Sequence, residues 1–319
     1  MQRRIILDTD LAMGAPGSDI DDGFALALAV DLAGVSLELV TTVNGNTDVE
    51  TSTLLAVDLL DRLGRPDIPV VKGAVSPLRR PVHDHPARDR VAGVQERLAH
   101  RTPAPGRAAI AIIDHVLANP QEITLVAIGP LTNVALALAL EPALSSSVRE
   151  IVIMGGAFLR TTKLLAMPGE FNIWIDPEAA AIVLNSGAPL RFLGLDVTLQ
   201  VELGRADADR LIATERPFAS YAGECAHAWI DYLAHTYPGH DYVSAPMHDA
   251  LAVAAVAKPH LVTWRPARVA VEVASDITRG VTVADLLAAR HPPAPNCLVA
   301  TEVDDTAFIE FFLNHVYSL

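Results

Sequence analysis

Cysteine, basic residues and aromatic residues are all scarce in this chain of 319 residues. Its two cysteines, Cys225 and Cys297, lie far apart and form no CxxC motif, so the sequence offers neither a disulfide framework nor a zinc cluster. Lysine and arginine number 24 against 38 aspartates and glutamates, which gives a formal net charge of −14. Because such a surface repels nucleic acid and anionic membranes, we expect neither as a partner.

Long apolar runs are absent as well. No segment approaches the roughly 18 consecutive apolar residues of a transmembrane helix, and the apolar run at residues 5–7 is too short for a signal peptide. We therefore expect a cytoplasmic protein. What the chain does contain is 51% hydrophobic and only 19% charged residues, a composition typical of a compact globular protein with a large core.

Short apolar segments of strand length alternate with helical patterns along most of the chain. This alternation predicts one α/β domain over residues 1–319, with an open, mostly parallel, Rossmann-like central sheet covered by helices on both faces. The expected strands are residues 4–7, 37–43, 123–128, 151–154 and 190–195. The expected helices are residues 22–32, 49–63, 107–117, 133–140 and 177–184.

Two stretches interrupt this alternation, residues 76–106 and residues 239–247. Loops of that length in compact domains usually have a function or lack fixed structure. Residues 206–235 have a helical pattern that contains several aromatic side chains. We expect these aromatics to pack in the core or between helices; they are Phe218, Tyr221, Trp229 and Tyr232.

Polar side chains follow the ends of the expected strands. Asp8 and Asp10 follow the first strand, Asn46 the second, Asn133 the third and Asp196 the fifth. In open α/β sheets, ligands bind outside the carboxyl ends of the strands. We therefore expect these segments to converge on one ligand-binding edge of the sheet.

Acidic residues are concentrated just after the first strand. Asp8 and Asp10 share one face of that strand, and Asp19, Asp21 and Asp22 follow where the next helix begins. Carboxylates this close repel each other unless a cation joins them, and an all-oxygen ligand set favours Ca²⁺ or Mg²⁺ over zinc. The simpler alternative is that Asp19 or Asp21 caps the helix and Asp22 interacts with its dipole.

Further polar residues precede or open other helices. His248 and Asp249 open an apolar helix, where one alternative makes them a surface histidine and an ordinary N-terminal helix charge. Asp176 stands before a proline and is explained as a helix N-cap. Glu170 and Asn172 are not explained by capping, which makes them candidates for ligand binding.

These residues belong to a series of motifs that resembles the nucleoside hydrolases, the inosine-uridine-preferring N-ribohydrolases. The series follows the family's order and covers most of the chain. Its members are ILDTD at residues 6–10, DDGFAL at 21–26, TTVNGN at 41–46, IGPLTN at 128–133, MGG at 154–156, EFN at 170–172, DPEAA at 176–180 and HDA at 248–250.

The resemblance implies Ca²⁺-dependent hydrolysis of the N-glycosidic bond of ribonucleosides to ribose and free base, through an oxocarbenium-like transition state. It implies that Asp10, Asp22, Asp249 and the backbone carbonyl of Ile128 bind the Ca²⁺. Asp8 would support these ligands without binding the ion itself. Asp10 would also accept the proton of the attacking water. Such chemistry needs carboxylates near a developing positive charge and a metal that lowers the pKa of water.

The same resemblance implies the residues that contact the nucleoside. The groups that would hold the ribose are Asp21, Asn46, Met154, Glu170 and Asn172. His248 resembles the residue that protonates a departing purine in many members. The resemblance also implies a homodimer or a homotetramer, and soluble oligomers of this kind are commonly symmetric.

Three features depart from the family's pattern. Residues 11–20 form a longer connection than the family's short Pro-Gly turn. Counting back six residues from Glu170 reaches Leu164, where many members have an asparagine near the 5′ end of the ribose. The segment that corresponds to the family's flexible His-Gly region contains His83 and His85.

Two other functions fit parts of the pattern. A non-catalytic pentose- or nucleoside-binding protein would keep the metal site for ligand capture, and release of a free base would exclude it. Asp8 and Asp10 also match the nucleophile and the acid of haloacid-dehalogenase-type phosphatases, but that motif expects Thr or Val where Ala12 stands.

Overall fold

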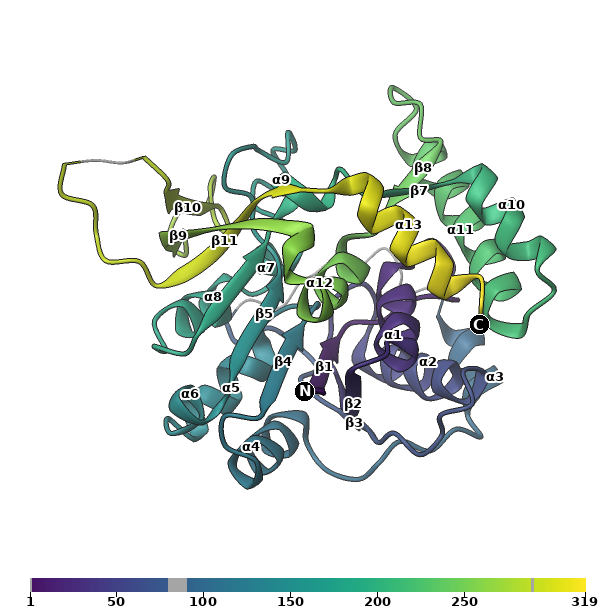
Figure 1. Cartoon of the computed structure of the whole chain (residues 1–319), viewed down its shortest axis with the longest axis horizontal. Helices are drawn as coiled ribbons and strands as arrows, with labels where there is room; N and C mark the ends of the chain where they lie inside the picture. The colour runs from purple at the N-terminus through teal and green to yellow at the C-terminus, as the bar shows by residue number, and fades with distance from the viewer. Residues whose placement is uncertain (1, 80–90, 288–289) are drawn as a thin grey trace.

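The first strand is an interior strand of a nine-stranded sheet with the order β10-β9-β11-β6-β5-β4-β1-β2-β3. The computed structural model describes residues 2–79, 91–287 and 290–319 (Figure 1). The strands of this sheet are β1 (Arg3–Thr9), β2 (Val35–Thr42), β3 (Val70–Lys72), β4 (Ile123–Ala127), β5 (Glu150–Met154), β6 (Leu190–Leu193), β9 (Val262–Val271), β10 (Thr282–Asp285) and β11 (Cys297–Val303). Neighbouring strands from β11 to β3 are parallel, whereas β9 and β10 extend one edge in antiparallel fashion.

All five strands expected from the sequence are present as β1, β2, β4, β5 and β6, so the mostly parallel α/β fold is confirmed. The sequence pattern missed β3, β9 to β11 and the small antiparallel pair of β7 (Glu202–Gly204) and β8 (Ser244–Pro246). The reason is clearest in β9, where buried residues alternate with exposed ones. An antiparallel strand with this alternation lacks the continuous apolar run by which a buried parallel strand is recognised.

Helices cover both faces of the sheet (Figure 1). They are α1 (Asp21–Asp31), α2 (Val49–Arg62), α3 (Ala92–Leu98), α4 (Ala108–Ala118), α5 (Thr132–Leu140), α6 (Leu144–Ser147), α7 (Phe171–Ile175), α8 (Pro177–Leu184), α9 (Leu195–Thr198), α10 (Arg205–Ala213), α11 (Pro217–Thr236), α12 (His248–Ala257) and α13 (Asp305–Val316). Alternate residues of β1 face opposite cores: Ile5 and Leu7 pack with α1, α2 and α12, and Ile6 packs with α4, α5 and α8. This is the period-two alternation of a strand that is buried on both faces.

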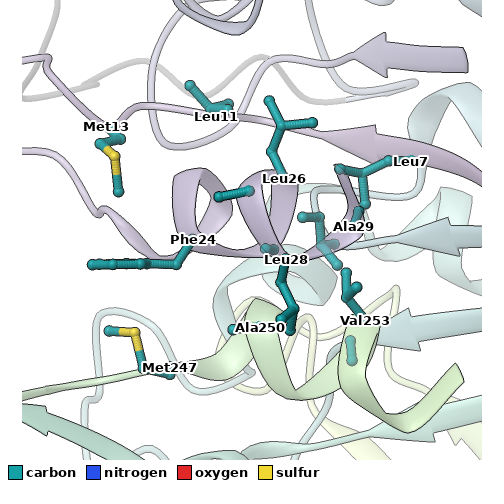
Figure 2. Packing of buried hydrophobic residues seen from close by; sticks show 14 of the residues in the cluster. Leu7, Leu11, Met13, Phe24, Leu26, Leu28, Ala29, Met247, Ala250 and Val253 are labelled. Atoms are coloured by element: carbon teal, nitrogen blue, oxygen red, sulfur yellow. The ribbon is translucent and has the colours of Figure 1, made fainter. Parts of the chain in front are cut away.

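Helices α1 and α12 lie side by side and run in the same direction (Figure 2). Leu28 of α1 packs against Ala250 and Val253 of α12, and all three side chains are fully buried. Four of the remaining eight α12 residues are alanines, which allow the two helix axes to approach closely. As a result, the N-terminus of α12 lies next to the N-terminus of α1, at the carboxyl edge of the sheet.

The stretches that interrupt the sequence pattern contain short regular elements. Residues 76–106 include α3, which packs on α2, and residues 239–247 include β8. The helical pattern of residues 206–235 forms two helices, α10 and α11. None of the helices in the described part of the chain is long and apolar enough to span a bilayer.

Candidate active site

A cavity of about 400 Å³ lies at the carboxyl edge of the sheet. Eight of the eleven site residues expected from the sequence line it: Asp21, Asn46, Ile128, Met154, Glu170, Asn172, His248 and Asp249. The other three, Asp8, Asp10 and Asp22, are fully buried and do not line the cavity. The expected convergence of the strand ends on one edge is therefore present.

Three carboxylates meet where the paired helices begin. Asp21, Asp22 and Asp249 each offer an oxygen that lies within 4.8 Å of the other two, a spacing that suits a metal ion. The backbone N–H of Asp249 donates to Oδ2 of Asp21 at 3.0 Å, which joins α12 to α1. Both helix N-termini direct positive dipole ends toward this group. The expected set had Asp10 in place of Asp21, so Asp22 and Asp249 are common to both sets and Asp10 is not one of the three.

Asp10 lies beneath this group and is held by the loop after β2. Its Oδ2 accepts the backbone N–H of Asn46 at 2.6 Å, and the Asn46 side chain donates to Oδ2 of Asp22 at 3.0 Å. Its Oδ1 is buried and has no hydrogen-bond partner in the protein. A Cβ atom at Gly45 or Gly129 would lie 1.9 or 2.8 Å from the Asp10 carboxylate oxygens, so only glycine fits at these two positions.

The electrostatics of the group require compensation. Burial, followed by the neighbouring carboxylates, raises the pKa of Asp10, Asp21 and Asp249 well above the usual range. Burial also raises the pKa of Asp22 to about 7, although the hydroxyl of Thr9 donates to it. Several buried like charges without a partner would be costly, whereas a divalent cation would stabilise all of them. The all-oxygen donor set and the unpartnered Oδ1 of Asp10 both fit such a cation.

Asp8 lies two residues before Asp10 and takes part in hydrogen bonds that connect neighbouring elements. Its Oδ1 accepts the hydroxyl of Thr41 at 2.5 Å and the amide of Asn133 at 2.8 Å, which ties β1 to β2 and α5. Burial raises its pKa to about 6. Asn133 also donates to the carbonyl of Thr42 and accepts from Ala74, so one asparagine fixes several strand ends.

Glu170 is explained by capping, and the expectation that it was not is wrong. It is the N-cap of α7, and its two oxygens accept the backbone N–H groups of Asn172 at 2.8 Å, Gly156 at 3.0 Å and Ile173 at 3.2 Å. The sequence pattern missed this because α7 has only five residues. Burial nevertheless raises the pKa of Glu170 to about 7, and the residue still lines the cavity.

Asn172 orients a carbonyl that was expected to bind metal. Its Nδ2 donates to the backbone oxygen of Ile128 at 2.8 Å and lies 3.3 Å from that of Met154. A carbonyl oxygen has two lone pairs, so Ile128 can accept this bond and face the cavity as well.

His248 forms its hydrogen bond with a residue that the sequence did not reveal. Its Nδ1 lies 2.7 Å from the hydroxyl of Thr198, at the end of α9, and burial lowers its pKa to about 4. Thr198 lies two residues after Asp196, the polar residue that follows β6. The polar residues after this strand could therefore have indicated Thr198 as part of the site. Asp196 itself accepts the N–H groups of Phe158 and Leu159 and holds the loop after β5.

Helix α11 provides an aromatic wall of the cavity. Trp229 and Tyr232 are stacked, with ring centroids 5.4 Å apart and an angle of 12° between the ring planes. Phe218 is in the core as expected, but Trp229 and Tyr232 also line the cavity. A cavity-facing side of the helix is visible in the sequence as the spacing 229, 232, 233 and 236, typical of one helix face.

The count that placed Leu164 beside the ribose does not match the structure. The side chain of Leu164 is 40% exposed and does not line the cavity, whereas Met167 from the same loop does. A turn with Lys163 at a φ of 60° changes the direction of the chain there. His83 and His85 lie outside the described residues.

The family model for inosine-uridine preferring nucleoside hydrolases matches residues 5–310. The chain belongs to the inosine-uridine preferring nucleoside hydrolase family. This confirms the expected enzyme class, a hydrolase of N-glycosyl bonds, and leaves no support for a haloacid-dehalogenase-type phosphatase.

Known members of the nucleoside hydrolase family resemble the chain over nearly its whole length. The non-specific ribonucleoside hydrolase RihC of Salmonella paratyphi C is 38% identical over 307 residues, which are 95% of this chain and 94% of the relative. The structure of the plant nucleoside hydrolase PpNRh1 matches with a TM-score of 0.89 and 29% identity over 100% of both chains. A purine-preferring ribonucleoside hydrolase from Gardnerella vaginalis matches with a TM-score of 0.85 and 28% identity over 99% of this chain and 98% of its own.

The buried carboxylates of this nucleoside hydrolase make its stability depend on pH when no cation is bound. The folded-state pKa values of Asp8, Asp22 and Glu170 are raised to about 6, 7 and 7. The folded chain therefore binds more protons than the unfolded chain between about pH 4 and pH 7, so its stability falls as pH rises through that range. After chelation, we expect the melting temperature at pH 5.5 to exceed that at pH 7.5 by at least about 5 °C.

Thermal unfolding followed by circular dichroism checks this expectation. Added Ca²⁺ should raise the melting temperature more at pH 7.5 than at pH 5.5, because a cation binds the ionised carboxylates. A chelated protein that melts at a higher temperature at pH 7.5 would contradict the assignment of uncompensated carboxylates.

Proposed function

We propose that this chain hydrolyses the N-glycosidic bond of ribonucleosides to ribose and free base, with Ca²⁺ as its cofactor. The observation that carries the proposal is the group of buried carboxylates beneath a cavity of about 400 Å³, a volume typical of small-molecule sites. The names of the similar proteins, which act on ribonucleosides, support the same substrate class.

We assign the cation to a set of oxygen ligands. Asp22, Asp249 and the unpartnered Oδ1 of Asp10 would hold it, together with the carbonyl of Ile128. Carboxylate and carbonyl oxygens in an irregular arrangement suit Ca²⁺ better than the strict octahedron of Mg²⁺. When bound, such a cation lowers the pKa of water and so makes it a nucleophile near neutral pH.

The protein groups around the cation have separate tasks. Asp10 would accept the proton of the attacking water, because a water bound to the cation would lie next to its buried carboxylate, whose Oδ1 has no hydrogen-bond partner in the protein. The carboxylates as a group would stabilise the positive charge that develops on the sugar. The ribose would be held by the polar residues that line the cavity floor, namely Asp21, Asn46, Glu170 and Asn172, with Met154 beneath it.

The charge of the cavity favours a nucleoside over a nucleotide. Four of its lining residues are acidic: Asp19, Asp21, Glu170 and Asp249. No lysine or arginine is among the described residues that line it. A 5′-phosphate would therefore meet carboxylates and no compensating cation from the protein.

His248 would serve the departing base. If the hydroxyl of Thr198 donates to Nδ1, the neutral imidazole carries its hydrogen on Nε2, from which it can donate a hydrogen bond to a nitrogen of the departing base. Stabilising the leaving base is the second requirement of the reaction, since a purine anion is a poor leaving group in water.

Replacing Asp10 tests the general base. Asp10→Asn keeps the shape of the side chain but cannot accept the proton, so we expect kcat for inosine to fall at least about 100-fold. Release of free base and of reducing sugar measures the activity, and circular dichroism checks the fold. Asp114→Asn, at an exposed position of α4, is the matched control and should retain full activity. An Asp10→Asn enzyme with unchanged kcat would refute the assignment.

Replacing His248 separates catalysis from packing. We expect His248→Ala to lower kcat for inosine by about 100-fold but to leave a riboside with an activated nitrophenolate leaving group within about threefold, because that group departs without a proton. Thr198→Val should show the same pattern with a smaller loss, since it removes only the hydrogen bond to the imidazole. Equal losses on both substrates would assign His248 a packing role instead.

A further inference from the structure

The long connection between β1 and α1 is an ordered part of the cavity wall. Its residues Leu11, Met13 and Ser18 are 0%, 1% and 6% exposed. Gly14 and Gly17 have φ values of 96° and 68°, in the positive region that favours glycine. This connection, residues 11–20, is therefore held in one conformation by its surroundings, and we call it the β1–α1 loop.

Tyr221 of α11 clamps the β1–α1 loop. Its hydroxyl donates to the carbonyl of Met13 at 3.3 Å, and a Cβ atom at Gly14 would lie only 2.0 Å from the Tyr221 oxygen. The guanidinium of Arg62 covers the Tyr221 ring at 4.3 Å and is itself paired with Asp58 at 2.8 Å. Met13 in turn packs against the first turn of α1, so that a Cβ atom at Gly23 would meet its side chain.

The far end of the β1–α1 loop presents two polar side chains to the cavity. Ser18 and Asp19 both line it. The hydroxyl of Ser18 is buried and has no hydrogen-bond partner in the protein. Asp19 has no task in the ribose and cation assignments above, although its carboxyl contacts that of Asp21. The Ser18 hydroxyl is therefore a buried donor without a partner, next to a carboxylate whose Oδ1 accepts the backbone N–H of Ile20 at 2.7 Å.

The position of the pair points to the base rather than the sugar. The β1–α1 loop is joined to the carboxylate floor at both of its ends and to the aromatic wall of α11 through Tyr221. Ser18 and Asp19 line the same cavity as Asp21 and Asp249 of the floor and Trp229 and Tyr232 of the wall. A nucleoside with its ribose on the floor and its base against Trp229 and Tyr232 would bring an edge of the base toward the end of the β1–α1 loop.

We propose that Ser18 and Asp19, positioned by Tyr221, recognise bases that carry an exocyclic amino group, as in cytidine and adenosine. A carboxylate only accepts hydrogen bonds, so it binds an amino group and repels the carbonyl that uridine and inosine have at the same place. The Ser18 hydroxyl can donate to the neighbouring ring nitrogen. This inference rests on the proposed nucleoside hydrolysis, and it concerns the choice of base.

Paired substrates test the proposal. We expect kcat/KM to be higher for cytidine than for uridine and higher for adenosine than for inosine. Asp19→Asn, whose amide serves both kinds of base, should lower each ratio by about tenfold or more, and Ser18→Ala should lower it less. Asp31→Asn, an exposed position on the same helix as Asp21, is the matched control and should leave both ratios unchanged. Ratios that Asp19→Asn does not alter would overturn the proposal.

Two binding measurements distinguish recognition of the base from a role of Asp19 in cation binding and from an effect on turnover. Calorimetric titration of Ca²⁺ should give the same affinity for Asp19→Asn as for the unmodified chain, and a tenfold loss would assign Asp19 to the cation instead and overturn the proposal. Dissociation constants of cytidine and uridine on an Asp10→Asn background test recognition without turnover. If no nucleoside is cleaved, the proposed function fails, whereas these constants still decide whether the pair selects the base.

The clamp has its own test. Gly14→Ala brings a methyl group against the Tyr221 oxygen and should displace the β1–α1 loop, which lowers the cytidine-to-uridine ratio by about threefold or more. Tyr221→Phe removes the hydroxyl that donates to Met13 and keeps the ring, so it should lower the ratio in the same direction. A Tyr221→Phe enzyme with the full preference would show that Tyr221 does not position the pair.

Discussion

The parallel packing of α1 against α12 is the constraint on which the site depends. It joins Asp21 to the backbone of Asp249 across 228 residues of sequence, and it brings two helix N-termini to one point of the sheet edge. The contact is made by fully buried aliphatic side chains, so the hydrophobic core fixes the positions of the carboxylates. A change in the α1–α12 interface would therefore alter the site without touching any polar residue.

The carboxylates in turn impose requirements on the loops that surround them. Asp10 has glycine on two sides because no Cβ atom fits beside its carboxylate, and Asn46 holds Asp10 and Asp22 with its backbone and side chain. Burial raises the pKa values of these carboxylates, because their ionised forms are unfavourable without a partner. A hard cation bound between them would stabilise the ionised forms. The fit of the site to a cation and the repulsion between its buried carboxylates therefore have the same physical origin.

Much of this organisation could be predicted from the sequence. The buried strands are continuous apolar runs, and the polar residues directly after them mark the edge where the site lies; the family motifs then assign tasks to eleven residues, whose individual roles stay predictions. The antiparallel edge of β9 to β11 could not be recognised, because its residues alternate between buried and exposed. Glu170 was misjudged because the helix it caps is only one turn long.

Other parts of the site depend on tertiary contacts that no local pattern contains. Thr198 meets His248 across 50 residues, and Tyr221 meets Met13 across 208. Residue counting failed at Leu164, since the loop turns before it reaches the cavity and places Met167 there instead. Spacing in the sequence predicts neighbours within an element, whereas a loop between two elements needs the structure.

The central claim is that the carboxylate group is built around a cation that the reaction needs. Its most direct test is the release of hypoxanthine from inosine by chelated protein as Ca²⁺ is titrated back, with the bound metal counted by elemental analysis. We expect that chelation abolishes base release and that activity returns in proportion to occupancy, with saturation near about one ion per chain. A chain that contains no metal and still releases hypoxanthine at the full rate would contradict it.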